Sequence, residues 1–238
     1  MNLILFESAE TNSPLPRHDS RAAHILDVLH RKVGDTLDAG LVNGPRGKAT
    51  LAAVSADALT LNFAWENLPP PPPAPIALIV GLPRPQTVRK ILHSATELGV
   101  AAVHFVVTEK SEPGYEQSTL WSSGEWRRHL VDAAQQAFDT RLPEITHGRK
   151  LAEALASFEK TPLCLALDNY ESPQPLSAAA IIAPIVLALG PERGWSARDR
   201  DMLRVHGFAL AHLGPRVLRA ETAAIAALAI VRSKLGFM

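Results

Sequence analysis

The sequence has very little cysteine and no excess of charge. A single cysteine, Cys164, stands among 238 residues, and 24 basic residues balance 24 acidic ones. One thiol cannot form an internal disulfide framework or a zinc site built from several cysteines. A net charge of zero excludes a grossly basic tail, so any contact with nucleic acid must come from local patches.

Targeting and membrane signals are also missing. The first ten residues, MNLILFESAE, hold a short apolar stretch with no basic residue before it and no small-residue cleavage pattern. No apolar run approaches the length of a membrane span. We therefore expect a soluble, cytoplasmic protein with no membrane partner.

The motifs of several common enzyme classes do not occur. The chain has no GxxxxGK[ST] loop, no GxGxxG turn after a strand and no GxSxG elbow. Its nine histidines are scattered without the spacing of metal ligands. We therefore predict neither a metal nor a charged phosphate cradle, and expect backbone amides to hold the ligand.

What the sequence does contain is a proline-rich segment that divides it. Six of the eight residues in LPPPPPAP, residues 68–75, are proline. Proline lacks the N–H that a helix or a sheet ladder needs, which predicts a stiff, extended linker. The expected domains are therefore residues 1–67 and 76–238.

The first part is predicted to be a small β-barrel with one short helix. Its strands are expected at 36–41, 48–54 and 58–64, separated by turn signals such as Asn43-Gly44-Pro45. Before them, RAAHILDVL at 21–29 has the apolar spacing of a helix.

The second part alternates between strands and helices. Continuous apolar runs of strand length lie at 77–82, 102–107, 163–168, 185–190 and 208–213. Helices are expected over 88–98 before Gly99, from a capping box at Ser122–Glu125, after a cap at Ser196 with Asp199, and over about 219–234. This alternation predicts an α/β domain with a mainly parallel sheet.

Two loops at strand ends are the candidate ligand site, because open parallel sheets bind ligands at the carboxyl ends of their strands. LGPERGW (189–195) and LGPRVLRAETA (213–223) both place Leu-Gly-Pro there. Glycine permits close approach of the backbone to a ligand, and proline forces an abrupt turn. Two ordinary turns are the alternative interpretation.

This pair of loops resembles the carboxyl-terminal signature of SPOUT methyltransferases, specifically the RsmE type. ATELGV (95–100), TEKS (108–111), EWRRHLVDAAQQ (125–136), RLPEI (141–145) and, more weakly, HILDVLHRKVGDTL (24–37) extend the resemblance over nearly the whole chain. The resemblance implies an N-terminal PUA-like β-barrel that binds RNA, followed by a SPOUT α/β domain with a C-terminal trefoil knot. It also implies S-adenosylmethionine (SAM) as methyl donor, N3 of a uridine in 16S small-subunit ribosomal RNA as acceptor, and a homodimer.

Site residues follow from the same resemblance. Arg219, with Glu221 to orient it, is the candidate for stabilising the developing uridinate, and Glu192 is a candidate general base. The residues expected to bind SAM are Leu167, Leu189, Gly190, Pro191, Glu192, Leu213, Gly214, Leu218, Arg219 and Thr222.

Three positions depart from the pattern of the family. Arg193 stands where a second glycine is usual, His93 where a lysine is common, and AFDT at 137–140 replaces Ser-Gly-Arg. These departures leave open a SPOUT methyltransferase that acts on another RNA or base position. A second alternative is an inactive SAM-fold protein that binds RNA, and the retention of Arg219, Glu221 and Thr222 argues against it. An unrelated α/β enzyme for small molecules is a third.

Overall fold

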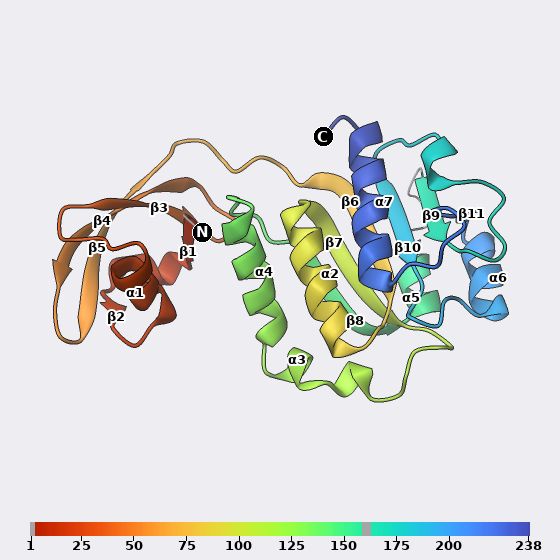
Figure 1. Cartoon of the computed structure of the whole chain (residues 1–238), viewed down its shortest axis with the longest axis horizontal. Coiled ribbons are helices and arrows are strands. Elements are labelled where there is room, and N and C mark those ends of the chain that lie inside the picture. The colour runs from red at the N-terminus through yellow and green to blue at the C-terminus, as the bar shows by residue number, and fades with distance from the viewer. Residues whose placement is uncertain (1–2, 159–162) are drawn as a thin grey trace. The chain divides into compact units, whose positions relative to one another are not determined.

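The computed structural model describes residues 3–158 and 163–238 and divides into two compact units (Figure 1). The first comprises residues 1–72 together with 131–142, and the second comprises residues 73–130 together with 143–238. The helix α4 (Glu125–Gln136) therefore contributes residues to both units.

The first unit is built on a five-stranded mixed sheet. Its elements are β1 (Leu3–Phe6), β2 (Leu15–Pro16), α1 (Ser20–Ala23), β3 (Thr36–Leu41), β4 (Arg46–Val54) and β5 (Ala58–Trp65), with short helical turns at Ser8–Asn12 and His24–Val28. The strand order is β1-β3-β4-β5-β2, and β1 pairs with β3 in parallel while the other pairs are antiparallel. Alternate side chains of these strands, with Ile25, form one apolar core.

The second unit contains a six-stranded sheet whose paired strands all run parallel. The strands are β6 (Ala74–Gly81), β7 (Val100–Val107), β8 (Glu144–Lys150), β9 (Leu163–Leu167), β10 (Ile185–Leu189) and β11 (Ala209–Ala211). They are ordered β11-β9-β10-β6-β7-β8. The expected α/β class is therefore confirmed, and the strand order reverses between β6 and β10, where ligands bind in such sheets.

Helices cover both faces of this sheet. They are α2 (Pro85–Glu97), α3 (Thr119–Ser122), α5 (Leu151–Ala156), α6 (Ala197–Val205) and α7 (Ala220–Lys234), with short 3-10 turns at Tyr115–Gln117 and Leu176–Ala178. Side chains of α5 and α6 share an apolar cluster with Ile79, Val186 and Ala188 of the sheet. α2 and α7 pack together over the sheet, in yellow and blue (Figure 1).

Local signals in the sequence predict most helix boundaries. Ser196 and Asp199 form the expected reciprocal capping box, each side chain accepting from the other's backbone N–H at 3.0 Å. Gly99 ends α2 with a φ of +64°, as a C′ residue should. The box expected at Ser122–Glu125 is wrong, because Ser122 is the last residue of α3 and Ser123 Oγ accepts from the N–H of Glu125 instead.

The expected strands are confirmed within a few residues, and three strands were missed. β1 and β2 are too short to show alternation, and β8 has polar side chains at most positions because it lies at an edge of the sheet. β6 also begins at Ala74, inside the stretch expected to be linker.

None of the helices in the described part of the chain has the length and apolar character of a membrane span.

Candidate functional site

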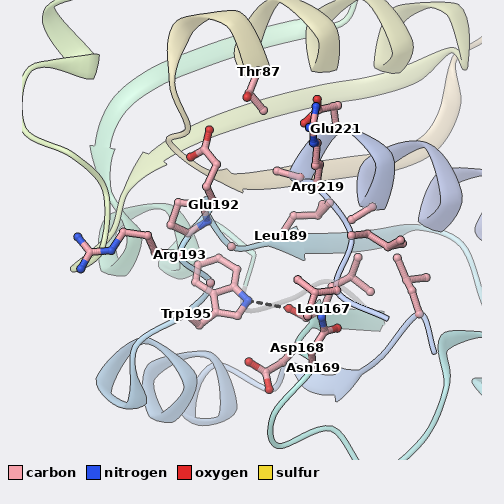
Figure 2. A pocket seen from close by; sticks show the side chains of 18 of the residues that line it. Thr87, Leu167, Asp168, Asn169, Leu189, Glu192, Arg193, Trp195, Arg219 and Glu221 are labelled. Carbon is pink, nitrogen blue, oxygen red and sulfur yellow. Dashed lines mark hydrogen bonds between the residues drawn. The ribbon is translucent and has the colours of Figure 1, made fainter. Parts of the chain in front are cut away.

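A cavity of about 470 Å³ opens at the carboxyl ends of β9, β10 and β11, between loops of the second unit (Figure 2). This volume lies within the range of small-molecule sites. The N-termini of α2 and α7 complete its wall. The cavity therefore lies where the strand order and the paired Leu-Gly-Pro loops predict a ligand.

Most of the predicted site residues line this cavity. Those brought together are Leu167, Leu189, Gly190, Pro191, Glu192, Leu213, Leu218, Arg219 and Glu221. Lining residues that the sequence interpretation missed are Arg84, Thr87, Asp168, Asn169, Tyr170, Arg193, Gly194, Trp195, Val217, Ala220 and Ala223. Several of these follow directly after predicted strands, so the strand-end rule could have found them.

Two predicted residues, Gly214 and Thr222, are not among the residues that line the cavity. Thr222 is exposed on the first turn of α7. A Cβ added at Gly214 would meet no atom within 4 Å, but the residue has a φ of +104°. Glycine is therefore needed at 214 for the backbone conformation rather than for close approach.

Close packing shapes the loop after β10. A Cβ at Gly190 would lie 3.1 Å from backbone atoms of Gly194 and Trp195, and a Cβ at Gly81 would lie 2.4 Å from Cδ of Pro191. At both positions a larger residue would force the neighbouring backbone or Pro191 to move away. The loop is thus held against the end of β6, with no room for added atoms.

Hydrogen bonds of Trp195 and Lys110 hold the loop after β10 in place. The indole Nε1 of buried Trp195 donates to the carbonyl oxygen of Leu167 at 2.9 Å (Figure 2). The ammonium group of Lys110 donates to the carbonyl oxygens of Trp195 at 3.0 Å and Arg193 at 3.3 Å. These bonds join the loop to the ends of β9 and β7.

Glu192 lies where the loop after β10 meets α2. Its Oε1 accepts the backbone N–H of Arg84 at 3.0 Å, and Nε of Arg84 lies 3.8 Å from the same oxygen. Arg84 is the N-cap residue of α2, so the carboxylate sits at the positive end of the helix dipole. Glu192 is therefore oriented by the protein at the wall of the cavity.

Glu221 forms a hydrogen-bonded ion pair with a lysine that the sequence analysis did not single out. Its Oε1 accepts a hydrogen bond from Nζ of Lys90 on α2 at 2.9 Å, whereas Arg219 precedes α7 as an exposed N-cap residue. The ammonium group of Lys90 holds the pKa of Glu221 below its ordinary value, and the charge of Arg219 acts in the same direction. The role of Glu221 in orienting Arg219 stays a prediction, and the structure adds Lys90 as the hydrogen-bond partner of Glu221.

A buried ion pair supports the loop after β9. Oδ2 of Asp168 accepts from Nε of Arg200 on α6 at 2.7 Å, and Oδ1 accepts the backbone N–H groups of Tyr170 and Glu171 at 2.8 and 2.7 Å. Burial acts to raise the pKa of Asp168, but these hydrogen bonds outweigh it and the pKa lies below its ordinary value. Asp168 is thus ionised and fully bonded.

The arrangement suits a ligand that is partly apolar and partly polar. The lining combines leucines and small side chains with the charged groups of Glu192, Arg219 and Glu221 (Figure 2). Within residues 3–158 and 163–238, no group of three or more His, Cys, Asp or Glu side chains is placed to hold a metal ion.

Parts of the sequence are similar to known RNA methyltransferases. Residues 70–232 match the model of the RNA methyltransferase domain family. Over 97% of its length, the chain is 33% identical to ribosomal RNA small subunit methyltransferase E of Treponema pallidum, covering 90% of that protein. It is 26% identical to ribosomal RNA small subunit methyltransferase E 1 of Borreliella burgdorferi, over 99% of both chains.

Solved structures show the same fold. A ribosomal RNA small subunit methyltransferase E from Neisseria gonorrhoeae, bound to S-adenosyl methionine, superposes with a TM-score of 0.75 at 20% identity, with 98% of this chain and 97% of that chain covered. The family model covers more than half of the chain, and the Treponema pallidum relative is 33% identical over 97% of it. This chain therefore belongs to the RNA methyltransferase domain family, in its ribosomal RNA small subunit methyltransferase E group.

Proposed function

We propose that this protein transfers the methyl group of SAM to N3 of a uridine in 16S small-subunit ribosomal RNA. The observation that carries the proposal is the cavity at the two Leu-Gly-Pro loops, lined by nine of the residues that the resemblance to the RsmE type assigns to the site. The names of the curated relatives, which describe small-subunit ribosomal RNA methyltransferases, support the RNA.

The residues present fit SAM. Leu167, Leu189, Leu213 and Leu218 offer the flat apolar surface that adenine needs, and Gly190 leaves its backbone accessible at the cavity. Glu192 supplies a carboxylate for a ribose hydroxyl or for the neighbourhood of the sulfonium charge. SAM, when bound, supplies an electrophilic methyl group.

Residues of the chain would then act on the acceptor base. Methylation at N3 requires loss of the imide proton and places negative charge on the uridine oxygens. The guanidinium of Arg219, at the start of α7, is proposed to stabilise that charge. Glu221 and Lys90 fix the first turn of α7, and Glu192 is the candidate that accepts the proton.

Nucleoside mass spectrometry tests this function directly. Small-subunit ribosomal RNA from a strain that lacks the gene is incubated with the protein and SAM, then digested to nucleosides. We expect N3-methyluridine. A methylcytidine or a ribose-methylated nucleoside would instead support an enzyme of altered specificity, and no product with intact SAM and RNA binding would support the inactive RNA-binding protein.

A substitution at Gly190 tests whether the cavity binds SAM. Gly190→Val should weaken SAM binding, because the new side chain must displace the backbone of Gly194 and Trp195, which line the cavity. Calorimetry measures the effect, and Gly190→Ala should fall between wild type and the valine variant. Wild-type affinity in a folded Gly190→Val protein would place the SAM site elsewhere.

The finer architecture belongs to the same proposal. Residues 1–67 would form a PUA-like barrel that supplies RNA affinity, residues 68–75 a linker, and residues 76–238 the SPOUT methyltransferase domain with a trefoil knot. The mixed sheet of the first unit supports the barrel. The path from β11 at the sheet edge back to α7 beside β10 and α2 supports the knot. The proposed place of action is the cytoplasm.

A homodimer is also proposed. The helix α7 is rich in alanine and leaves Ile225 exposed, which suits close packing against another helix. Sedimentation at micromolar concentration should show two chains per particle. A fully active monomer would contradict this expectation.

A further inference from the structure

An exposed tyrosine stands at the rim of the cavity. Tyr170 lines the cavity yet leaves 77% of its surface exposed, so it contributes little to the apolar core. Its turn is nevertheless rigidly built, because the buried carboxylate of Asp168 accepts the backbone N–H groups of Tyr170 and Glu171. The backbone of Tyr170 is therefore fixed, although its side chain makes few contacts with the rest of the protein.

The same ion pair also orients the ring of Tyr170. The guanidinium carbon of Arg200 lies 5.3 Å from the ring centroid, within the range of a cation–π contact. Arg200 is itself fixed by Asp168 and by Glu171, which accepts from its NH1 group at 3.1 Å. One side of the ring is therefore supported by the protein, while most of its surface remains open to solvent.

A planar ligand group is the natural partner of such a ring. Two planar groups would approach this cavity under the proposed function: the adenine of SAM and the bases of the RNA. The leucines of the inner wall suit the adenine, whereas Tyr170 is on the exposed rim. Single-stranded RNA is commonly bound by stacking of its bases on exposed aromatic side chains.

We propose that Tyr170 is a stacking surface for a nucleobase that flanks the methylated nucleotide; this inference rests on the proposed RNA methyltransferase function. Its neighbours Asp168 and Asn169 lie on the opposite side of the cavity from Arg219 and Glu221 (Figure 2). A target base held near Arg219 would therefore leave a neighbouring base of the same strand to meet Tyr170.

The test measures RNA and SAM binding separately. Tyr170→Ala should weaken binding of small-subunit ribosomal RNA by about 5–150-fold, the range that follows from about 1–3 kcal/mol for one base–aromatic stack, and leave SAM affinity unchanged. Tyr170→Phe and Tyr170→Trp should retain RNA binding, since a ring suffices. Val205→Ala is the control, because Val205 is 83% exposed, has no ring and is not among the residues that line the cavity. We expect both affinities to stay at the wild-type level in this variant.

A spectroscopic readout identifies the stack itself. RNA carrying 2-aminopurine beside the target uridine should lose fluorescence on binding the wild type or Tyr170→Trp, and regain it with Tyr170→Ala. Both binding and fluorescence are measured with the demethylated product of SAM, so they do not depend on turnover. Failure of the wild type to methylate RNA would therefore refute the proposed function without deciding the stacking.

Three outcomes would overturn the inference. If Tyr170→Ala weakens SAM binding while RNA binding is kept, the ring covers the cofactor. If neither affinity changes and the fluorescence remains quenched, no base stacks on Tyr170. Loss of RNA binding in Tyr170→Phe would likewise contradict it, because the hydroxyl rather than the ring would then carry the contact.

Discussion

Arg219→Ala should lower the turnover of methyl transfer by about 10²–10³-fold, the usual effect of removing one preorganised electrostatic donor. Arg219 is exposed at the cavity as the N-cap residue of α7, and its proposed partner is the charge that develops on the uridine during the reaction. Single-turnover kinetics at saturating SAM measure the effect. The affinity for SAM, measured by calorimetry, should stay nearly unchanged.

Arg216→Ala provides a matched control. Arg216 is on the same loop, three residues before Arg219, and is also exposed, but it is not among the residues that line the cavity. We expect at most a weakened affinity for RNA in this variant, with turnover maintained at saturating RNA. A parallel fall of SAM affinity and activity in Arg219→Ala would show that Arg219 holds the cofactor or the loops instead.

Asp168→Asn should destabilise the protein by about 3 kcal/mol, the lower end of the usual cost of breaking a buried ion pair. The substitution keeps the shape of the side chain but leaves the buried guanidinium of Arg200 with only Glu171, which is partly exposed. The midpoint of thermal unfolding should fall by about 6–12 °C in a chain of this length. Asp201→Asn, which breaks an exposed pair with Arg204 on α6, should change stability by less than about 1 kcal/mol.

The loss of stability caused by Asp168→Asn should become smaller at acidic pH. Because the pKa of Asp168 is lower in the folded than in the unfolded protein, the ion pair stabilises the fold fully above the ordinary value of 3.8. That contribution is lost as the pH falls through the lower, folded-state pKa. Urea unfolding measures the free energy of unfolding of wild type and variant. The difference between the two free energies should be constant at neutral and mildly acidic pH and should become smaller below about pH 4. A difference that grew on acidification would contradict the assignment.

The fold was predictable where sequence patterns are local and strong. The runs at 163–168, 185–190 and 208–213 correspond to β9, β10 and β11, because strands buried on both faces are continuously apolar. β8 escaped prediction because an edge strand exposes most of its side chains and carries polar residues. Residues 131–142 group with the first unit, which no local pattern in the sequence indicates.

The sequence by itself determined the α/β class, the two Leu-Gly-Pro loops and the group of methyltransferases. Each of these depends on a local pattern: apolar runs of strand length, glycine and proline at turns, and the spacing of motifs. Only the tertiary structure decided which charges meet. It pairs Glu221 with Lys90, Asp168 with Arg200 and Glu192 with the N-terminus of α2. These partners are 32 to 131 residues apart, and it is the packing of helices against strands, which no local pattern encodes, that brings them together.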